Sequence, residues 1–285
     1  MLRGPAPTPD APVPATHRYA LSVHPEDAEV VAAELWAAGA LGVWERPGEL
    51  VAWFVARDVD VPPGGTFELE ADRDWQAEWK ATIQPVRAGR IAVVPTWRVE
   101  EHTPLDGEVT LVLDPGRAFG SGHHATTTLC LEALAERDLA GRTVADVGCG
   151  SGVLAIAAAR LGARAVGSDV DPDAVEVTAE NAARNDVAVP AAVGSVAAAL
   201  ELLDGAPADV VVANLVTDTV VALAGELVAA CATDGTLVVS GIAAERTERA
   251  TDALVAAGAE VADVRERDGW IAVVAHPARD GEVAR

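Results

Sequence analysis

The most restrictive feature of this 285-residue sequence is a fourfold alternation of short apolar runs with longer helical patterns. The short runs are rich in valine, which is typical of buried strands, and the longer segments have the apolar period of helices. The predicted strands are residues 143–147, 164–170, 208–215 and 235–241, and the predicted helices are residues 152–162, 172–185, 219–231 and 243–258. Repeated strand–helix units predict an α/β domain with a mainly parallel sheet and helices on both faces.

The end of this pattern differs from its beginning. Residues 259–276 predict two further strands around Asp268-Gly269, a dipeptide typical of a tight hairpin. The hairpin is expected to give the sheet an antiparallel edge. We place this α/β domain at residues 109–278, followed by a short tail at residues 279–285.

The sequence before residue 109 predicts a second, smaller domain. Alternating apolar residues indicate strands, and one longer pattern indicates a helix, so residues 17–72 are expected to form a small α+β domain. The strands are residues 17–23, 41–46, 50–56 and 66–71, and the helix is residues 25–40. Residues 73–108 are predicted to be a linker. Residues 1–16 are rich in Pro and Ala and lack the apolar core of a signal peptide, so a disordered tail is expected.

Charge and composition narrow the class of protein. The formal net charge of −23 argues against a nucleic-acid partner and fits either a basic protein partner or solubility alone. The sequence has no run of eighteen apolar residues, so no membrane-spanning helix is expected. Cys130, Cys149 and Cys231 are widely spaced, which predicts neither a disulfide framework nor a metal site and favours the cytoplasm.

The segment "VADVGCGSGVLA", residues 144–155, predicts a strand that ends in a glycine-rich turn and opens a helix. Gly148 and Gly150 allow a sharp turn and a close approach of a ligand to the backbone. Asp169 ends the next strand, where a carboxylate can accept hydrogen bonds from ribose hydroxyls. The alternative is a tight turn without a ligand.

The residues around this turn favour one kind of cofactor. A dinucleotide fingerprint fits only when it begins at Gly150, two residues late. Asp146 ends the preceding strand, and its carboxylate is a poor neighbour for a pyrophosphate but a good one for an ammonium or sulfonium group. S-adenosylmethionine carries both cations and no phosphate. A dehydrogenase and a cofactor-binding module without catalysis remain alternatives.

Two further segments are expected to face the same pocket. Asn214 ends a predicted strand, where ligands of open α/β sheets bind, although a helix cap is the alternative. In "DPGRAFGSGHHATTTLCLEAL", residues 114–134, Thr127 lies one helical turn before Leu131 and is expected to point inward. Phe119 could stack on an adenine. Ordinary loop polarity is the alternative for His124, and a metal ion shared with His123 is not expected.

These motifs together resemble a known family. "DPGRAFGSGHHATT", "DVGCGSGVLAIAAARLGA", "GSDVDPDAVEVTAENAARN" and "ANLV" are similar to the ribosomal protein L11 methyltransferases, the PrmA family, as is the linker "DWQAEWKATIQPVRAGRIAVVPTW". The resemblance covers about residues 74–276, whereas the N-terminal domain matches weakly. The sequence departs from the family pattern in the segment "DPGRAFGSGHHATT". The family usually has Thr at positions 121 and 123 and Pro at position 125, where this chain has Ser121, His123 and Ala125.

The resemblance implies a fold and a set of site residues. The fold is a seven-stranded Rossmann-like class I methyltransferase domain with a small N-terminal domain that recognises the substrate. The family's cofactor positions would fall on Thr127, Gly148, Asp169 and Asn214. The family strip also matches at Phe119, Gly122 and His124, and we add Asp146 and Gly150 to the expected cofactor-binding set.

The implied function is methyl transfer from S-adenosylmethionine to lysine ε-amines, an N-terminal α-amine or both, on ribosomal protein L11. Asn214 is the expected residue for orienting the accepting amine. The protein is expected to be a monomer that binds neither nucleic acid nor membranes. The alternatives within this enzyme class are a lysine methyltransferase acting on another protein and a methyltransferase acting on a small molecule.

Overall fold

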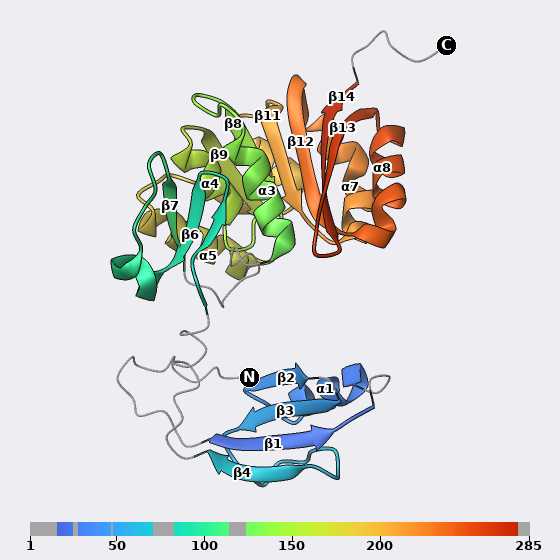
Figure 1. The fold of residues 1–285 in the computed structure, drawn as a ribbon. Coiled ribbons are helices and arrows are strands. Elements are labelled where there is room, and N and C mark those ends of the chain that lie inside the picture. Colours follow the sequence, from blue (N-terminus) through green and yellow to red (C-terminus); the bar gives the residue numbers. More distant parts are fainter. Residues whose placement is uncertain (1–15, 25–27, 47, 71–82, 114–123, 279–285) are drawn as a thin grey trace. The chain divides into compact units, whose positions relative to one another are not determined.

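The computed structural model describes residues 16–24, 28–46, 48–70, 83–113 and 124–278 (Figure 1). The chain divides into two compact units, Met1–Thr82 and Ile83–Arg285. The predicted tail at residues 279–285, the start of the predicted linker and residues 114–123 of the strip at residues 114–134 lie outside the described residues. Only the last residue of the predicted N-terminal tail, Thr16, is described, and it belongs to a strand.

The first unit is a four-stranded antiparallel sheet with one described helix. Its elements are β1 (Thr16–Ser22), α1 (Ala28–Ala37), β2 (Gly42–Arg46), β3 (Glu49–Phe54) and β4 (Thr66–Glu70), in the sheet order β2-β3-β1-β4. Leu35 of α1 is fully buried in one cluster with Tyr19 and Phe54 of the sheet. The apolar residues of the strands and of the helix therefore meet on one face, as their alternation predicts.

The second unit contains the parallel sheet predicted from the strand–helix repeat. Its strands are β8 (Thr143–Val147), β9 (Arg164–Asp169), β10 (Ala191–Val193), β11 (Ala208–Asn214), β12 (Cys231–Ala243), β13 (Ala259–Arg267) and β14 (Trp270–Pro277). The order is β10-β9-β8-β11-β12-β14-β13, and the first five strands are parallel. β14 is antiparallel to both of its neighbours. This order confirms the Rossmann-like class I methyltransferase fold.

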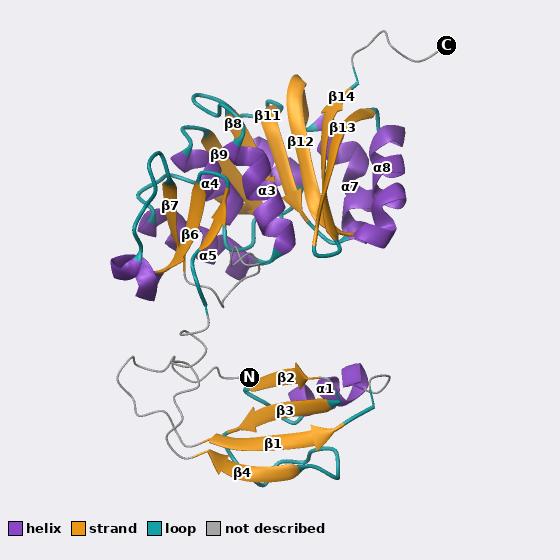
Figure 2. Ribbon diagram, in the orientation of Figure 1, coloured by secondary structure: helices purple, strands orange, loops and turns teal. Residues whose placement is uncertain are grey.

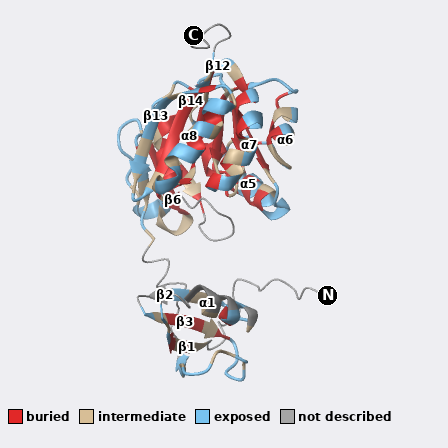
Figure 3. Ribbon diagram, turned by 90° about the vertical axis from the view of Figure 1, so that its right-hand side faces the viewer, coloured by how far each residue is buried: buried red, intermediate tan, exposed pale blue. Residues whose placement is uncertain are grey.

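Helices cover both faces of this sheet (Figure 2). They are α3 (Ala125–Ala135), α4 (Val153–Arg160), α5 (Pro172–Arg184), α6 (Val196–Glu201), α7 (Thr217–Ala229), α8 (Thr247–Ala256) and the short 3-10 helix η2 (Ala244–Arg246). Val144 of β8 packs in one cluster with residues of α3 and α4, and Ala145 packs in the other with residues of α6, α7 and α8. The strands β8, β11 and β14 inside the sheet are mostly buried, whereas the edge strand β13 is largely exposed (Figure 3). No helix in the described ranges is long and apolar enough to cross a membrane.

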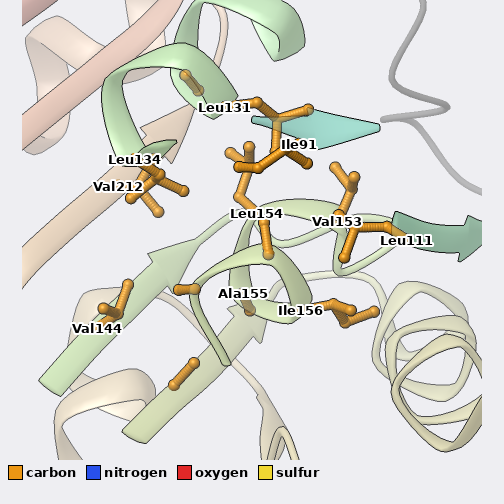
Figure 4. Packing of buried hydrophobic residues seen from close by; sticks show 14 of the residues in the cluster. Ile91, Leu111, Leu131, Leu134, Val144, Val153, Leu154, Ala155, Ile156 and Val212 are labelled. Atoms are coloured by element: carbon orange, nitrogen blue, oxygen red, sulfur yellow. The ribbon is translucent and has the colours of Figure 1, made fainter. Parts of the chain in front are cut away.

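A separate three-stranded sheet differs from the linker predicted for residues 73–108. It consists of β5 (Val86–Ala88), β6 (Ile91–Pro95) and β7 (Val109–Leu113), with the 3-10 helix η1 (Thr96–Glu101) after β6. Ile91 and Leu111 are fully buried with Leu131 of α3 and Leu154 of α4 (Figure 4). The described residues 83–108 are therefore part of the second unit, because their apolar side chains complete its core.

Candidate functional site

A pocket of about 450 Å³ lies at the carboxyl ends of the parallel strands. Its described lining residues are His124, Thr126, Val147, Gly148, Gly150, Asp169, Val170, Gly194, Ser195, Asn214, Leu215, Val216, Thr219, Leu223, Gly241 and Trp270. The sheet order reverses between β8 and β11, the kind of position at which open α/β sheets bind ligands. The pocket brings together five residues predicted from the sequence, namely His124, Gly148, Gly150, Asp169 and Asn214.

The glycine-rich turn connects β8 to α4 on the wall of the pocket. Gly148 and Gly150 have φ values of 76° and 53°, in the left-handed region that favours glycine. A β-carbon on Gly148 would lie 2.3 Å from Cδ2 of Leu215. The backbone N–H of Gly148 also donates to the carbonyl of Ser168 at 2.8 Å, which ties the turn to β9. The turn is thus fixed, and it brings backbone to the surface of the pocket at the start of α4.

Asp169 couples the end of β9 to the same turn. Its Oδ2 accepts the backbone N–H of Gly150 at 2.9 Å, and its Oδ1 accepts that of Asp171 at 3.0 Å. A carboxylate has about four acceptor positions, so each oxygen can accept a further hydrogen bond from a ligand. Asp171 itself is the N-cap of α5, where its Oδ1 accepts the backbone N–H of Asp173 at 3.0 Å.

Asn214 reaches the pocket from the end of β11, and Thr127 holds its side chain. The Asn214 Nδ2 donates to the Oγ1 of Thr127 at 3.2 Å, and Thr127 is fully buried in α3, as its helical spacing predicts. The Asn214 Oδ1 is buried and has no hydrogen-bond partner among the described residues. Val216 is the N-cap of α7, so the alternative of Asn214 as a helix cap is wrong. The amide oxygen is therefore the Asn214 atom left to accept a hydrogen bond.

Two aromatic rings, those of His124 and Trp270, meet on the wall of the same pocket. The His124 side chain caps α3 through Thr126, whose hydroxyl lies 2.7 Å from Nδ1, so His124 has a structural role beyond loop polarity. The imidazole contacts the indole of Trp270 edge-on, with ring centroids 4.9 Å apart. Trp270 was not among the residues singled out from the sequence. Its one signal there was its place directly after the Asp268-Gly269 turn.

Asp146 and Thr127 are absent from the described lining of the pocket. Asp146 is fully buried at the end of β8, where its Oδ2 accepts the backbone N–H of Ala155 in α4 at 3.1 Å. Burial raises the pKa of the Asp146 carboxyl to about 7, because the charged form loses its hydration. The negative charge of Asp169 raises this pKa further.

The remaining predicted features lie elsewhere. Phe119, Gly122 and His123 are outside the described residues. The three cysteines are free and buried, and burial raises the pKa of the Cys130 and Cys149 thiols to about 12. Within the described ranges, no group of three or more His, Cys, Asp or Glu side chains could hold a metal ion.

Comparisons with known proteins agree with this geometry. The family model for "Ribosomal protein L11 methyltransferase (PrmA)" matches residues 55–277. A ribosomal protein L11 methyltransferase of Deinococcus radiodurans is 41% identical over 77% of this chain and 82% of its own length. That of Thermus thermophilus is 39% identical over 83% and 90%, respectively.

A solved structure supports the same assignment. The crystal structure of a ribosomal protein L11 methylase from Lactobacillus delbrueckii subsp. bulgaricus matches with a TM-score of 0.62 and 29% identity. The match covers 69% of this chain and all of that one. The chain therefore belongs to the ribosomal protein L11 methyltransferase (PrmA) family, and it is an S-adenosylmethionine-dependent protein methyltransferase, as its motifs predict.

Proposed function

We propose that this protein transfers methyl groups from S-adenosylmethionine to lysine ε-amines, the N-terminal α-amine or both, on ribosomal protein L11. The relatives that match most of the chain carry the name of this substrate. The observation that carries the proposal is the Asn214 amide. Thr127 fixes its nitrogen, and its oxygen is a buried acceptor with no partner among the described residues.

The residues on one side of Asn214 fit the cofactor. Gly148 and Gly150 line the pocket at the start of α4, and Asp169 has acceptor positions left for two ribose hydroxyls. We assign cofactor binding to these three residues and Asn214, with Thr127 acting through Asn214.

The other residues predicted to bind the cofactor are expected to act in different ways. Asp146 stabilises the glycine-rich turn indirectly, because its Oδ2 accepts the backbone N–H of Ala155 in the first turn of α4. His124 borders the pocket at the start of α3. Phe119 and Gly122 complete the proposed cofactor-binding set on the strength of the sequence motif alone.

The reaction requires a neutral amine at the Asn214 side chain. The bound cofactor would supply a methyl group on a sulfonium, and the electron pair of the S–C bond would stay on sulfur as the amine lone pair forms the new N–C bond. The methylated nitrogen would then release a proton to solvent. An N–H of the amine donated to the Asn214 Oδ1 would orient the lone pair, so the protein contributes mainly by positioning.

Charge favours a basic protein as the acceptor. The chain has 44 acidic and 21 basic residues, which gives a formal net charge of −23. No lysine or arginine is among the described residues that line the pocket, so nothing there repels an incoming amine. Complementary charge speeds the encounter of two proteins and opposes wrong partners of like charge.

The test is methylation of purified ribosomal protein L11. The protein is incubated with L11 and S-adenosylmethionine, and the mass of intact L11 and of its peptides is measured. The expected result is the addition of methyl groups to amines, which requires the cofactor and is strongly reduced in an Asn214→Ala variant assayed at a saturating cofactor concentration.

Controls separate the alternatives. A parallel reaction with a cell extract and methyl-labelled cofactor reports acceptors other than L11. Cofactor binding together with labelling of a different protein or of a small molecule, while L11 remains unmodified, would refute the proposed substrate. Thermal stabilisation by NAD and not by S-adenosylmethionine would refute the cofactor.

A further inference from the structure

The pocket extends past Asn214 on the side away from the proposed cofactor contacts. In the sheet order β9-β8-β11-β12-β14, Asn214 on β11 stands two strands from Asp169 and two strands from Trp270. Neighbouring strands lie about 4.8 Å apart, so each half of the pocket spans about 10 Å along the sheet. The half between Asn214 and Trp270 contains none of the glycine-turn or carboxylate contacts assigned to the cofactor.

Trp270 reaches this edge because its strand runs in the opposite direction. The parallel strands end at the pocket, whereas β14 begins there, with Trp270 paired to Ala243 near the end of β12. Gly241 precedes this pair on β12 and lines the same half. A β-carbon on Gly241 would clash with the carbonyl oxygen of Leu215, so the backbones of β12 and Leu215 pack directly against each other at this point.

The lining of this half is apolar and aromatic. Val216 and Leu223 of the pocket lining contribute aliphatic side chains and Trp270 contributes an indole, whereas the side chain of Leu215 lies against Gly148 of the glycine-rich turn. His124 holds one edge of the indole, and its own ring is fixed by the hydrogen bond to Thr126 at the start of α3. A side chain whose neighbours are fixed loses little conformational entropy when a ligand binds, so the indole is already organised for binding.

We propose that Trp270, supported by His124, forms an acceptor subsite that binds the aliphatic stem and the amino group of a substrate lysine. This inference rests on the proposed function and names the acceptor that the same pocket prefers. A lysine has a four-carbon stem that can lie on apolar surface while its cationic end stays near polar groups. An aromatic face attracts an ammonium group, so Trp270 can receive the lysine in its charged form before the neutral amine reaches Asn214, and apolar walls favour the methylene stem.

The same lining discriminates against other acceptors. Asp169 is the only carboxylate among the described lining residues, and the walls near Trp270 offer no charged partner for an anionic substrate. An N-terminal α-amine has no methylene stem between the nitrogen and the backbone. It therefore gains less from the apolar half, and lysines are expected to depend on Trp270 more than the N-terminal amine does.

The first experiment measures binding without turnover. Nα-acetyl-lysine amide is titrated into the full-length protein saturated with S-adenosylhomocysteine, with Nα-acetyl-norleucine amide as the control that lacks the amine. The variants are Trp270→Ala, Trp270→Phe and, as a matched control, Val264→Ala, an exposed apolar position on β13. The expected Kd rises about tenfold in Trp270→Ala, changes little in Val264→Ala and is largely restored in Trp270→Phe.

The second experiment measures methylation of L11 site by site with the same variants. Trp270→Ala is expected to raise KM for lysine sites about tenfold, to affect the N-terminal α-amine less and to leave the Kd of S-adenosylmethionine within about twofold. Equal binding of the lysine probe to wild type and Trp270→Ala, or a cofactor Kd that changes as much as KM, would overturn the subsite. If L11 is not methylated while the lysine probe still binds through Trp270, then the proposed substrate fails and the subsite stands.

Discussion

The hydrogen bond between Thr127 and Asn214 can be removed with almost no change in shape. Valine has nearly the volume of threonine and lacks its hydroxyl. Thr127 is fully buried, and its Oγ1 lies 3.2 Å from the Nδ2 of Asn214. The Thr127→Val variant therefore takes away the acceptor of one Asn214 N–H and leaves the packing of α3 intact.

The size of the effect follows from the burial of that N–H. A buried donor without a partner costs about 1–3 kcal/mol. If keeping the Asn214 oxygen toward the substrate amine raises the barrier by this amount, the methylation rate falls roughly 5- to 150-fold, because each 1.4 kcal/mol changes the rate about tenfold. We expect kcat to fall about tenfold or more. The Kd of the cofactor is expected to change less than kcat, since Gly148, Gly150 and Asp169 are assigned to the cofactor and do not depend on Thr127.

Two further variants test whether Thr127 acts through Asn214. Thr127→Ser keeps the hydroxyl and is expected to retain most of the activity. In the Asn214→Ala background, Thr127→Val is expected to cause no additional loss, because the interaction is already absent. Steady-state kinetics on L11, calorimetric titration of the cofactor and thermal melting separate kcat, Kd and stability. Independent, multiplicative effects of the two substitutions, or no activity in Thr127→Ser, would show that Thr127 does not position Asn214.

Three further predictions concern stability. Burial raises the pKa of Asp146 to about 7, so its stabilising contribution is present below about pH 4 and is lost as the pH rises to about 7. The free energy of unfolding of Asp146→Asn, measured by chemical denaturation without cofactor, should therefore fall less over this pH range than that of the wild type. Asn185 in the loop after α5 bonds both the N–H and the C=O of Val112 at 2.7 and 2.8 Å, so Asn185→Leu should lower Tm by roughly 5–15 °C. Gly241 and Gly258 both have positive φ, but only a β-carbon at Gly241 would meet backbone atoms. Gly241→Ala should therefore lower the free energy of unfolding by about 2 kcal/mol more than Gly258→Ala, and equal losses would contradict this.

The order of the strands and helices in the second unit could be read from the sequence. Valine-rich runs and helical periods place β8, β9, β11 and β12 with their following helices, and Asp268-Gly269 marks the turn before β14. These signals are local, since each depends on residues within one element. β10 and α6 were not predicted, because a three-residue strand and a six-residue helix are too short to show a period.

Pairing between distant segments could not be read in the same way. β6 pairs in parallel with β7, and this pairing makes residues 83–108 part of the core instead of a linker. Ile91 is fully buried, and no pattern within β6 specifies which strand lies beside it. The helical spacing of Thr127 predicted that it points inward, but its partner is 87 residues away in the chain. Tertiary structure alone supplies that contact.

The direction of β14 decides whether the pocket has an aromatic wall. β14 has eight residues, so its two ends lie about 24 Å apart. In a parallel arrangement, Trp270 would stand at the opposite edge of the sheet and Pro277 would face the pocket. The antiparallel insertion of β14 between β12 and β13 instead places Trp270 at the edge where Asp169 and Asn214 end their strands. A parallel half that supplies backbone turns and an antiparallel half that supplies side chains thus meet at Asn214, which is why one amide can serve both the cofactor and the acceptor.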